Sequence, residues 1–309
     1  MNTKKANWMF LCIVLITIGV ELLIAITGIG EYLSMTAGMV LSEAMILIPC
    51  LCFLLFQRDP MNRTLGFHKV KISNLLLIVV YTWCMMPLVT MANAFSMIFV
   101  ENEIASMSDS FAQLSFPVLF FLTAINAPFC EEFVFRGAIY GSYRKEKISI
   151  KAMLLSALLF GLMHMNFNQA TYAFIIGVIM CLAYEATGSL FSTMVIHFVV
   201  NAGSTLYMGL VNWISPEMLE QSASLENDLD EVGMTLTQMY GLMTVMFMFV
   251  AAVTTVIGMC LLQYIAKRCG RPFFLQQLWE SRKEKSPRIV TVPLVLAVII
   301  CVAFMIWTQ

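Results

Sequence analysis

Long apolar segments separated by short polar stretches make up most of the chain. A helix that crosses a bilayer needs about 20 predominantly apolar residues. Nine segments reach or approach this length, and they run over residues 7–27, 34–56, 74–100, 113–141, 151–166, 168–186, 189–212, 237–266 and 290–308. The fifth segment is short and polar at its far end, which favours a helix buried among others. The pattern therefore predicts an all-α, polytopic membrane protein with about nine transmembrane helices, at least eight.

Basic residues mark one side of this arrangement. They precede the first segment and follow the second, fourth and eighth: Lys4, Lys5, Arg58, Arg63, Lys69, Lys71, Arg144, Lys145, Lys147, Lys151, Lys267, Arg268, Arg271, Arg282, Lys283, Lys285 and Arg288. If all nine segments cross, these stretches share a side, and the opposite side carries acids but no Lys or Arg: Glu31, Glu101, Glu103, Asp109 and the acidic stretch 217–231. The positive-inside rule then predicts a cytoplasmic N-terminus and an external C-terminus. The alternation supports the first eight segments, and the ninth depends on its length and apolarity alone.

Composition agrees with a membrane protein. The chain is 60% apolar and 12% charged, whereas soluble domains carry roughly 25% charged residues. We find no basic patch for nucleic acid, no glycine-rich phosphate loop, no internal repeat and no soluble domain, so residues 1–309 are interpreted as a single membrane domain with catalytic core helices over 113–212. Residues 1–28 are expected to be a retained first span rather than a signal peptide, because the apolar stretch is long and contains Glu21.

Three of the predicted helices contain polar groups that are costly in hydrocarbon. Of the 18 Lys and Arg residues, only Arg136 lies inside an apolar segment, shortly after Glu131 and Glu132. Glu132 and Arg136 are four residues apart and share a helix face, so they can neutralise each other. Glu131 is rotated by about 100° from its neighbour and needs a partner from another helix. The other helices contribute Phe160, His164, His197 and Asn201.

Helical rise places these groups at similar depths. At about 1.5 Å per residue, Glu131 lies roughly 15 Å, His197 roughly 12 Å and His164 roughly 20 Å from the basic side. A single site in the cytoplasmic half of the membrane is therefore predicted. The remaining histidine, His68, is expected in a solvated loop, and the nine cysteines are expected to be small buried hydrophobes. Three other acids, Glu21, Glu43 and Glu185, are expected to be hydrogen-bonded or interfacial groups.

This set of side chains suits the hydrolysis of an amide without a covalent intermediate. A carboxylate can act as a general base, a neutral His can orient a water, and a His with an Asn can donate hydrogen bonds to an oxyanion. No Ser-Lys or Ser-His pair at comparable spacing competes, and no Asp lies in any predicted span. Zinc held by Glu131, His164 and His197 is the rival chemistry. A His-Glu-x-x-His motif is absent, but spacing does not exclude zinc.

In chain order, the three motifs Glu-Glu-x-x-x-Arg, Phe-x-x-x-His and His-x-x-x-Asn resemble those of the CPBP family. This family comprises type II CAAX prenyl endopeptidases and bacterial bacteriocin-processing or self-immunity (Abi) proteins. The resemblance covers about residues 120–205. It implies an intramembrane endopeptidase in which Glu131 and His164 activate water and His197 with Asn201 stabilises the oxyanion. Supporting roles are implied for Glu132 and Arg136, and Phe160 belongs to the second motif.

These inferences lead to one expected function and two rivals. We expect a peptidase of the bacterial plasma membrane that acts on a membrane-associated peptide or protein, with no cofactor and no nucleic-acid partner; the sequence does not give the oligomeric state. A proton-coupled transporter would use the same polar groups, but we detect no inverted repeat, and Pro128 is the only proline close to them. A non-catalytic scaffold or immunity protein is the other rival, which the complete set of motifs disfavours.

Overall fold

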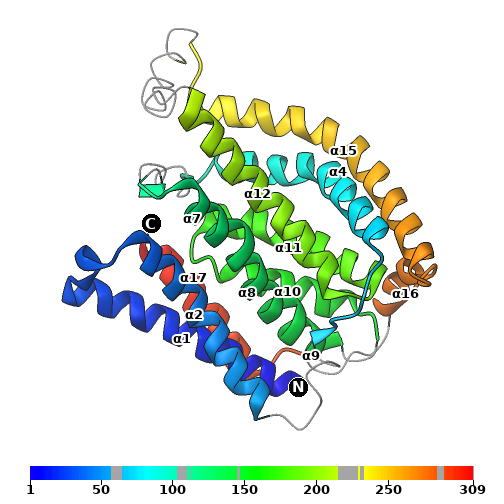
Figure 1. Cartoon of the computed structure of the whole chain (residues 1–309), viewed down its shortest axis with the longest axis horizontal. Coiled ribbons are helices and arrows are strands. Elements are labelled where there is room, and N and C mark those ends of the chain that lie inside the picture. Colours follow the sequence, from blue (N-terminus) through cyan, green and yellow to red (C-terminus); the bar gives the residue numbers. More distant parts are fainter. Residues whose placement is uncertain are drawn as a thin grey trace.

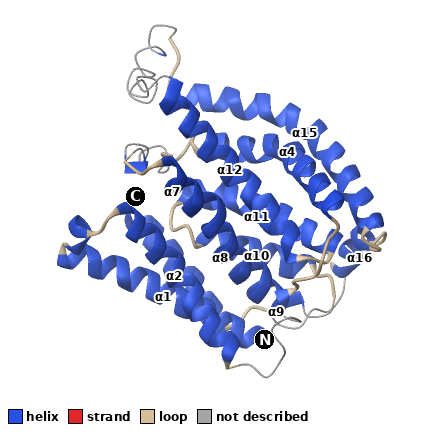
Figure 2. Ribbon diagram, viewed as in Figure 1, coloured by secondary structure: helices blue, strands red, loops and turns tan. Residues whose placement is uncertain are grey.

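The structure is a computed structural model that describes residues 1–56, 65–102, 110–111, 113–144, 147–214, 229, 233–283 and 289–308. Some predicted loop charges, including Arg58, Lys145 and most of the acidic stretch 217–231, lie outside these residues. The described part consists of helices joined by loops, with no strand (Figure 2). The helices are α1 Thr3–Thr27, η1 Ile29–Tyr32, α2 Met35–Leu55, α4 Ile72–Ser96, α7 Phe116–Phe120, η2 Phe121–Asn126, α8 Ala127–Glu132, η3 Phe133–Tyr140, α9 Gly141–Arg144, α10 Ile150–Leu162, α11 Phe167–Thr187, α12 Leu190–Ile214, α15 Leu236–Arg268, α16 Phe274–Ser281 and α17 Val292–Thr308.

The helical membrane architecture predicted from the sequence is confirmed. Within the described residues, seven helical stretches are long and apolar enough to cross a membrane, counting residues 116–144 as one stretch. The predicted fifth and ninth segments form shorter apolar helices, α10 and α17, of 13 and 17 residues. The protein is an integral membrane protein whose outer helix α15 exposes large apolar side chains, as a lipid-facing helix does: Leu242, Met246, Phe249, Val253 and Ile257.

The helices form three groups (Figure 1). Helices α1, α2 and α17 pack together at one edge, α4 packs along α15 at the opposite edge, and α7 to α12 lie between them. The N-terminus, α9 and α16 lie at one end of the bundle, and the C-terminus and the start of α7 lie toward the other end. Buried Asn7 of α1 links two of the groups, because its amide donates to Thr291 before α17 at 2.7 Å and its oxygen accepts from Tyr143 of α9 in the central group.

Small residues let α10 and α11 approach closely. A Cβ on Gly161 would lie 2.6 Å from the backbone oxygen of Ala170, and one on Gly177 would lie 2.9 Å from Ala157. Glycine permits backbones to pack at distances that any side chain would prevent. The chain then turns sharply between the two helices at Met165, which has a φ of 55°. This left-handed conformation is unfavourable for a non-glycine residue by about 1–2 kcal/mol, and it immediately follows His164.

Candidate active site

The two acids of the first motif lie on α8, between two π-helical segments, η2 and η3. A π-helical turn departs from the regular ladder of backbone hydrogen bonds and is frequent at functional sites. Side chains from neighbouring helices bond to carbonyl groups in both segments. The amide of Asn201 donates to the carbonyl of Thr123 at 2.9 Å, and the hydroxyl of Ser156 donates to the carbonyl of Phe135 at 3.0 Å. These contacts hold the irregular helix, and with it α8, in place.

Glu132 is the centre of a buried cluster of polar side chains. Its carboxylate accepts from Arg136 at 2.7 Å, and neither side chain is exposed. The same oxygen contacts Nδ1 of His197 at 3.0 Å. The predicted Glu132–Arg136 pair is therefore present, and it also anchors a histidine from another helix. Among the described residues, the other carboxylate oxygen of Glu132 and the Nε and Nη2 atoms of Arg136 make no hydrogen bond, so the loss of either charge would leave the other buried and uncompensated.

The ring of Phe160 lies at the centre of the site. The guanidinium of Arg136 lies 4.1 Å from its centroid, in a cation–π contact. The rings of His164 and His197 meet the same phenylalanine edge to face, with centroid separations of 5.0 and 5.7 Å. Phe160 thus contacts three of the polar side chains and limits how each can turn.

Hydrogen bonds assign which nitrogen of each imidazole faces the cavity. Nδ1 of His164 lies 2.9 Å from the carbonyl of Phe160, and a carbonyl only accepts, so this nitrogen carries the proton. A neutral His164 then keeps an acceptor at Nε2. Nδ1 of His197 is next to the Glu132 carboxylate, while its Nε2 lies 3.8 Å from Oε2 of Glu131. This separation is too long for a hydrogen bond, but a single water bonded to both atoms can span it.

The four residues predicted to be catalytic line one cavity of about 260 Å³: Glu131, His164, His197 and Asn201. Most of the remaining wall is apolar, and Thr123, Gln169 and Thr205 add polar atoms. A mostly apolar pocket with a few convergent polar groups is the usual form of a binding or active site. The structure therefore brings together the residues that the sequence singled out, and their roles stay predictions.

A second cavity of about 290 Å³ borders the same carboxylate from the side of α1 and α2. It shares Glu131, Phe160, His164 and Gln169 with the first cavity, and it is also lined by Glu21 and Glu43. One carboxylate oxygen of Glu43 is buried without a hydrogen-bond partner among the described residues. The expectation of a hydrogen-bonded or interfacial group does not describe this oxygen, because the side chain faces the site.

Both cavities extend away from the basic end of the bundle. The first is lined by Leu119 near the start of the stretch 116–144, by Tyr172 in the first half of α11 and by Met208 near the end of α12. The second is lined by Thr17 and Glu21 in the second half of α1. The basic ends of these stretches are Arg144, the end of α11 and the start of α12. The predicted opening toward the cytoplasmic half therefore has no support in the cavity linings. A depth counted along a helix does not give the direction in which a side chain points, so the side on which the site opens stays a prediction.

The positions of the side chains bear on the zinc alternative. Among the residues that the structure describes, no three His, Cys, Asp or Glu side chains are arranged as a group that could hold a metal ion, and this includes Glu131, His164 and His197. Zinc ligands lie about 2.0–2.2 Å from the ion when they are nitrogen or oxygen. The arrangement present thus does not form a ready ligand set, and catalysis without a metal stays a prediction.

Sequence reasoning missed several residues of the site. Thr193 is fully buried on α12, and its hydroxyl donates to the carbonyl of Leu190 at 2.9 Å; its spacing of four from His197 was a signal that could have placed it on the same face. The backbone carbonyl of Thr123 accepts a hydrogen bond from the amide of Asn201, and its hydroxyl is hydrogen-bonded to that of Thr205 at 2.9 Å. Nothing in the sequence marks Thr123, because a backbone carbonyl is present at every position.

Comparisons with known proteins bear on the part of the chain that carries the site. Residues 113–203 match the family model of the Rce1-like type II CAAX prenyl endopeptidases. A curated protein, the membrane-embedded CAAX protease MroQ of Staphylococcus aureus (strain USA300), is 31% identical over 117 residues, which cover 36% of this chain and 46% of MroQ. The match thus spans about half the length of that relative. No solved structure matches the chain. Both matches confirm the family resemblance, and together they support a membrane protease of the CPBP family.

Proposed function

We propose that the protein is an intramembrane endopeptidase that hydrolyses a peptide bond of a membrane-associated protein or peptide with activated water. The observation that carries the proposal is that Glu131, His164, His197 and Asn201, from three separate stretches of chain, line one cavity. The match to CAAX-type proteases supports the same reaction class in general.

Water would be activated between Glu131 and His164. The carboxylate takes a proton from the water as its oxygen attacks the peptide carbonyl carbon, and Nε2 of His164 accepts the second hydrogen to fix the orientation of the water. His164 is suited to this because its Nδ1 already donates to the carbonyl of Phe160. When the C–N bond breaks, protonated Glu131 gives its proton to the leaving amine, which restores the carboxylate.

The oxyanion formed by the attack would be stabilised by His197 and Asn201. Nε2 of His197 donates to it when both ring nitrogens carry protons, while Nδ1 stays on Glu132. One N–H of the Asn201 amide is used on Thr123, and the second can donate to the oxyanion. Preorganised donors of this kind usually contribute about 10²–10³-fold each to the rate.

The protein would lie in the bacterial plasma membrane with its basic ends in the cytoplasm. In this orientation both cavities extend from Glu131 toward the outer half, rather than the cytoplasmic half as the sequence suggested. Met208 lies at the far end of the first cavity. Thiol labelling of Met208→Cys in intact cells with a membrane-impermeant reagent should therefore exceed that of wild type. Labelling only after the cells are opened would reverse this orientation.

The decisive test replaces the general base. Glu131→Gln keeps the shape of the side chain but removes the proton acceptor, so turnover should fall by about 10²–10⁴-fold while folding survives. Peptides of membranes from cells expressing wild type or Glu131→Gln should be compared by mass spectrometry, with Glu31→Gln as a matched carboxylate control outside the site. Peptide ends present with wild type and with Glu31→Gln should be lost with Glu131→Gln. Unchanged peptide ends at equal protein level would refute the proposal.

Zinc chemistry needs a separate measurement. Purified wild type should contain no stoichiometric zinc, and treatment with a chelator followed by dialysis should leave its activity unchanged. One zinc per chain, lost and restored together with activity, would replace the water-activation scheme and leave the peptidase assignment intact.

A further inference from the structure

A second polar cavity lies at the basic end of the bundle, away from the candidate active site. It has a volume of about 480 Å³ and lies between the end of α9 and the chain from Gly270 to α16. Three cations line it, Arg144, Lys147 and Arg271, and one carboxylate, Glu280, which accepts from Gln276 at 2.9 Å. Among the described residues, the cavity wall therefore carries more positive than negative charge.

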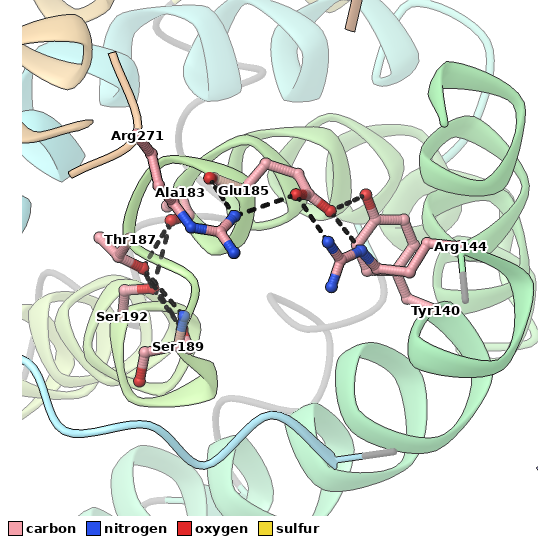
Figure 3. A network of polar contacts seen from close by, with 8 residues as sticks. All are labelled: Tyr140, Arg144, Ala183, Glu185, Thr187, Ser189, Ser192 and Arg271. Atoms are coloured by element: carbon pink, nitrogen blue, oxygen red, sulfur yellow. Dashed lines mark hydrogen bonds and ion pairs between the residues drawn. The ribbon is translucent and has the colours of Figure 1, made fainter. Parts of the chain in front are cut away.

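Two of these cations are held in place by one buried carboxylate, Glu185 of α11 (Figure 3). Arg144 forms an ion pair with it, with Nε 2.7 Å from Oε1, and its Nη2 donates to Oε2 at 3.1 Å. Nη1 of Arg271 lies 3.4 Å from Oε2 and donates to the backbone oxygen of Glu185 at 2.8 Å. Tyr140 donates to Oε1 at 2.7 Å. A single carboxylate neutralises only one of the two guanidinium groups, and both are fixed in position.

Arg271 retains donors that Glu185 does not use. A guanidinium has five N–H donors. In Arg271 only Nη1 donates to Glu185, and its Nε and Nη2 make no hydrogen bond among the described residues. These atoms lie over Gly188, where an added Cβ would be 2.9 Å from Nε. Gly188 has a φ of 74° and ends α11, so glycine both permits this turn and leaves space for the guanidinium. A pre-positioned planar fork with unused donors is suited to a phosphate or carboxylate group.

The surroundings of the cavity place it at the membrane–water interface, which indicates what kind of anion could reach it. Helix α16 buries Phe274 and Leu278 against the bundle and exposes Trp279, on which the guanidinium of Arg282 stacks at 3.2 Å. Exposed tryptophan beside basic residues is typical of the membrane–water interface. Phe273, which is 64% exposed, also borders the cavity. Its wall thus presents cations together with apolar surface at the level of the lipid headgroups.

We propose that this cavity binds the phosphate group of an anionic membrane lipid. The headgroup phosphate contacts the outer edge of Arg271 and the ammonium of Lys147, and the acyl chains lie along the apolar surface near Phe273. Binding at this place would stabilise the junction of α9, α11 and α16. The site is separate from the cavity at Glu131, so the proposal does not depend on the peptidase activity.

The test uses the full-length protein in a neutral detergent. Phosphatidylglycerol, phosphatidylcholine and inorganic phosphate are titrated separately, with the thermal unfolding midpoint and native mass spectrometry as readouts. Phosphatidylglycerol should raise the midpoint and remain bound as one lipid per chain, whereas phosphatidylcholine should do neither. Inorganic phosphate should bind more weakly, because it lacks the acyl chains. Equal effects of phosphate and phosphatidylglycerol would assign the cavity to a soluble phosphate compound and overturn the lipid proposal.

A pair of lysine variants separates a defined site from general attraction to negative charge. Lys147→Ala should weaken phosphatidylglycerol binding about fivefold, the contribution of one basic residue near an anionic membrane surface. Lys151→Ala removes a nearby exposed lysine that does not line the cavity. The affinity of this variant for phosphatidylglycerol should equal that of wild type. Equal weakening by both variants, or equal binding of both lipids by wild type, would refute the site. Arg271→Lys, which keeps the charge but loses the fork, should also weaken binding.

Discussion

Among the residues that the structure describes, two carboxylates are fully buried, those of Glu132 and Glu185, and each is bound by an arginine at 2.7 Å. Glu132 is bound by Arg136 of the next helical turn and by His197, and His197 lines the first cavity. Glu185 is bound by side chains that are 41 to 86 residues away in sequence, and it joins helix ends at the basic side of the bundle. The comparison shows that one kind of ion pair serves two purposes. At Glu132 it orients a ring beside a cavity, and at Glu185 it holds segments together.

The strongest test of this comparison is Arg136→Ala. It leaves Glu132 buried without its cation, which should lower the free energy of unfolding by about 3–5 kcal/mol. The amount of protein in membranes and the thermal unfolding midpoint in detergent should both fall. Arg136→Lys, which keeps a cation, should be milder. Normal accumulation of Arg136→Ala would mean that the buried pair is not required for folding.

Asn201→Ala should show whether the cavity beside the Glu132 cluster is catalytic. As an oxyanion donor, Asn201 should contribute about 10²–10³-fold to turnover, with little effect on substrate binding. Its bond to the carbonyl of Thr123 offers a structural role instead, and losing that bond would cost about 1–3 kcal/mol of stability. Turnover, KM and the unfolding midpoint should be measured together. A lower midpoint with turnover unchanged would assign Asn201 to structure, and a weakened affinity for zinc would favour the metal scheme.

Gly161→Ala tests the packing that places His164 beside the cavity. The new methyl group would lie 2.6 Å from the carbonyl oxygen of Ala170, a backbone atom that cannot turn aside. Forcing α10 and α11 apart should cost about 3 kcal/mol. Gly19→Ala is the matched control, since a Cβ there meets no atom within 4 Å. Equal unfolding midpoints for the two variants would show that the close approach of the helices is unimportant.

The smallest expected effect is that of Tyr140→Phe on the Glu185 side. It removes one donor from the carboxylate but leaves both arginines, so the cost should be about 1.5 kcal/mol. Denaturant or thermal unfolding in detergent measures it, with exposed Tyr207→Phe as the control. A loss as large as that of Arg136→Ala would remove the distinction between the two clusters.

Local spacing predicted part of the site well. The i, i+4 relation gave the Glu132–Arg136 pair, and it placed His197 and Asn201 on one face, because a helix turns by a fixed angle at every residue. The contact between His197 and Glu132 joins residues 65 positions apart, and no periodicity specifies which face of α12 packs on α8. The partners of Glu185 could not be predicted from the sequence for the same reason.

The sequence by itself determined the helical membrane class, the approximate helix boundaries, the segregation of basic residues and the motifs that carry the family resemblance. These features depend on composition and on neighbours within a few residues, because an apolar segment in the bilayer must satisfy its own backbone hydrogen bonds and therefore forms a helix. Only the tertiary structure decided that the site has two cavities, that Glu43 faces one of them, and that both extend away from the basic end. Side-chain direction depends on helix packing and on the irregular turns around α8, and contacts between distant segments fix both.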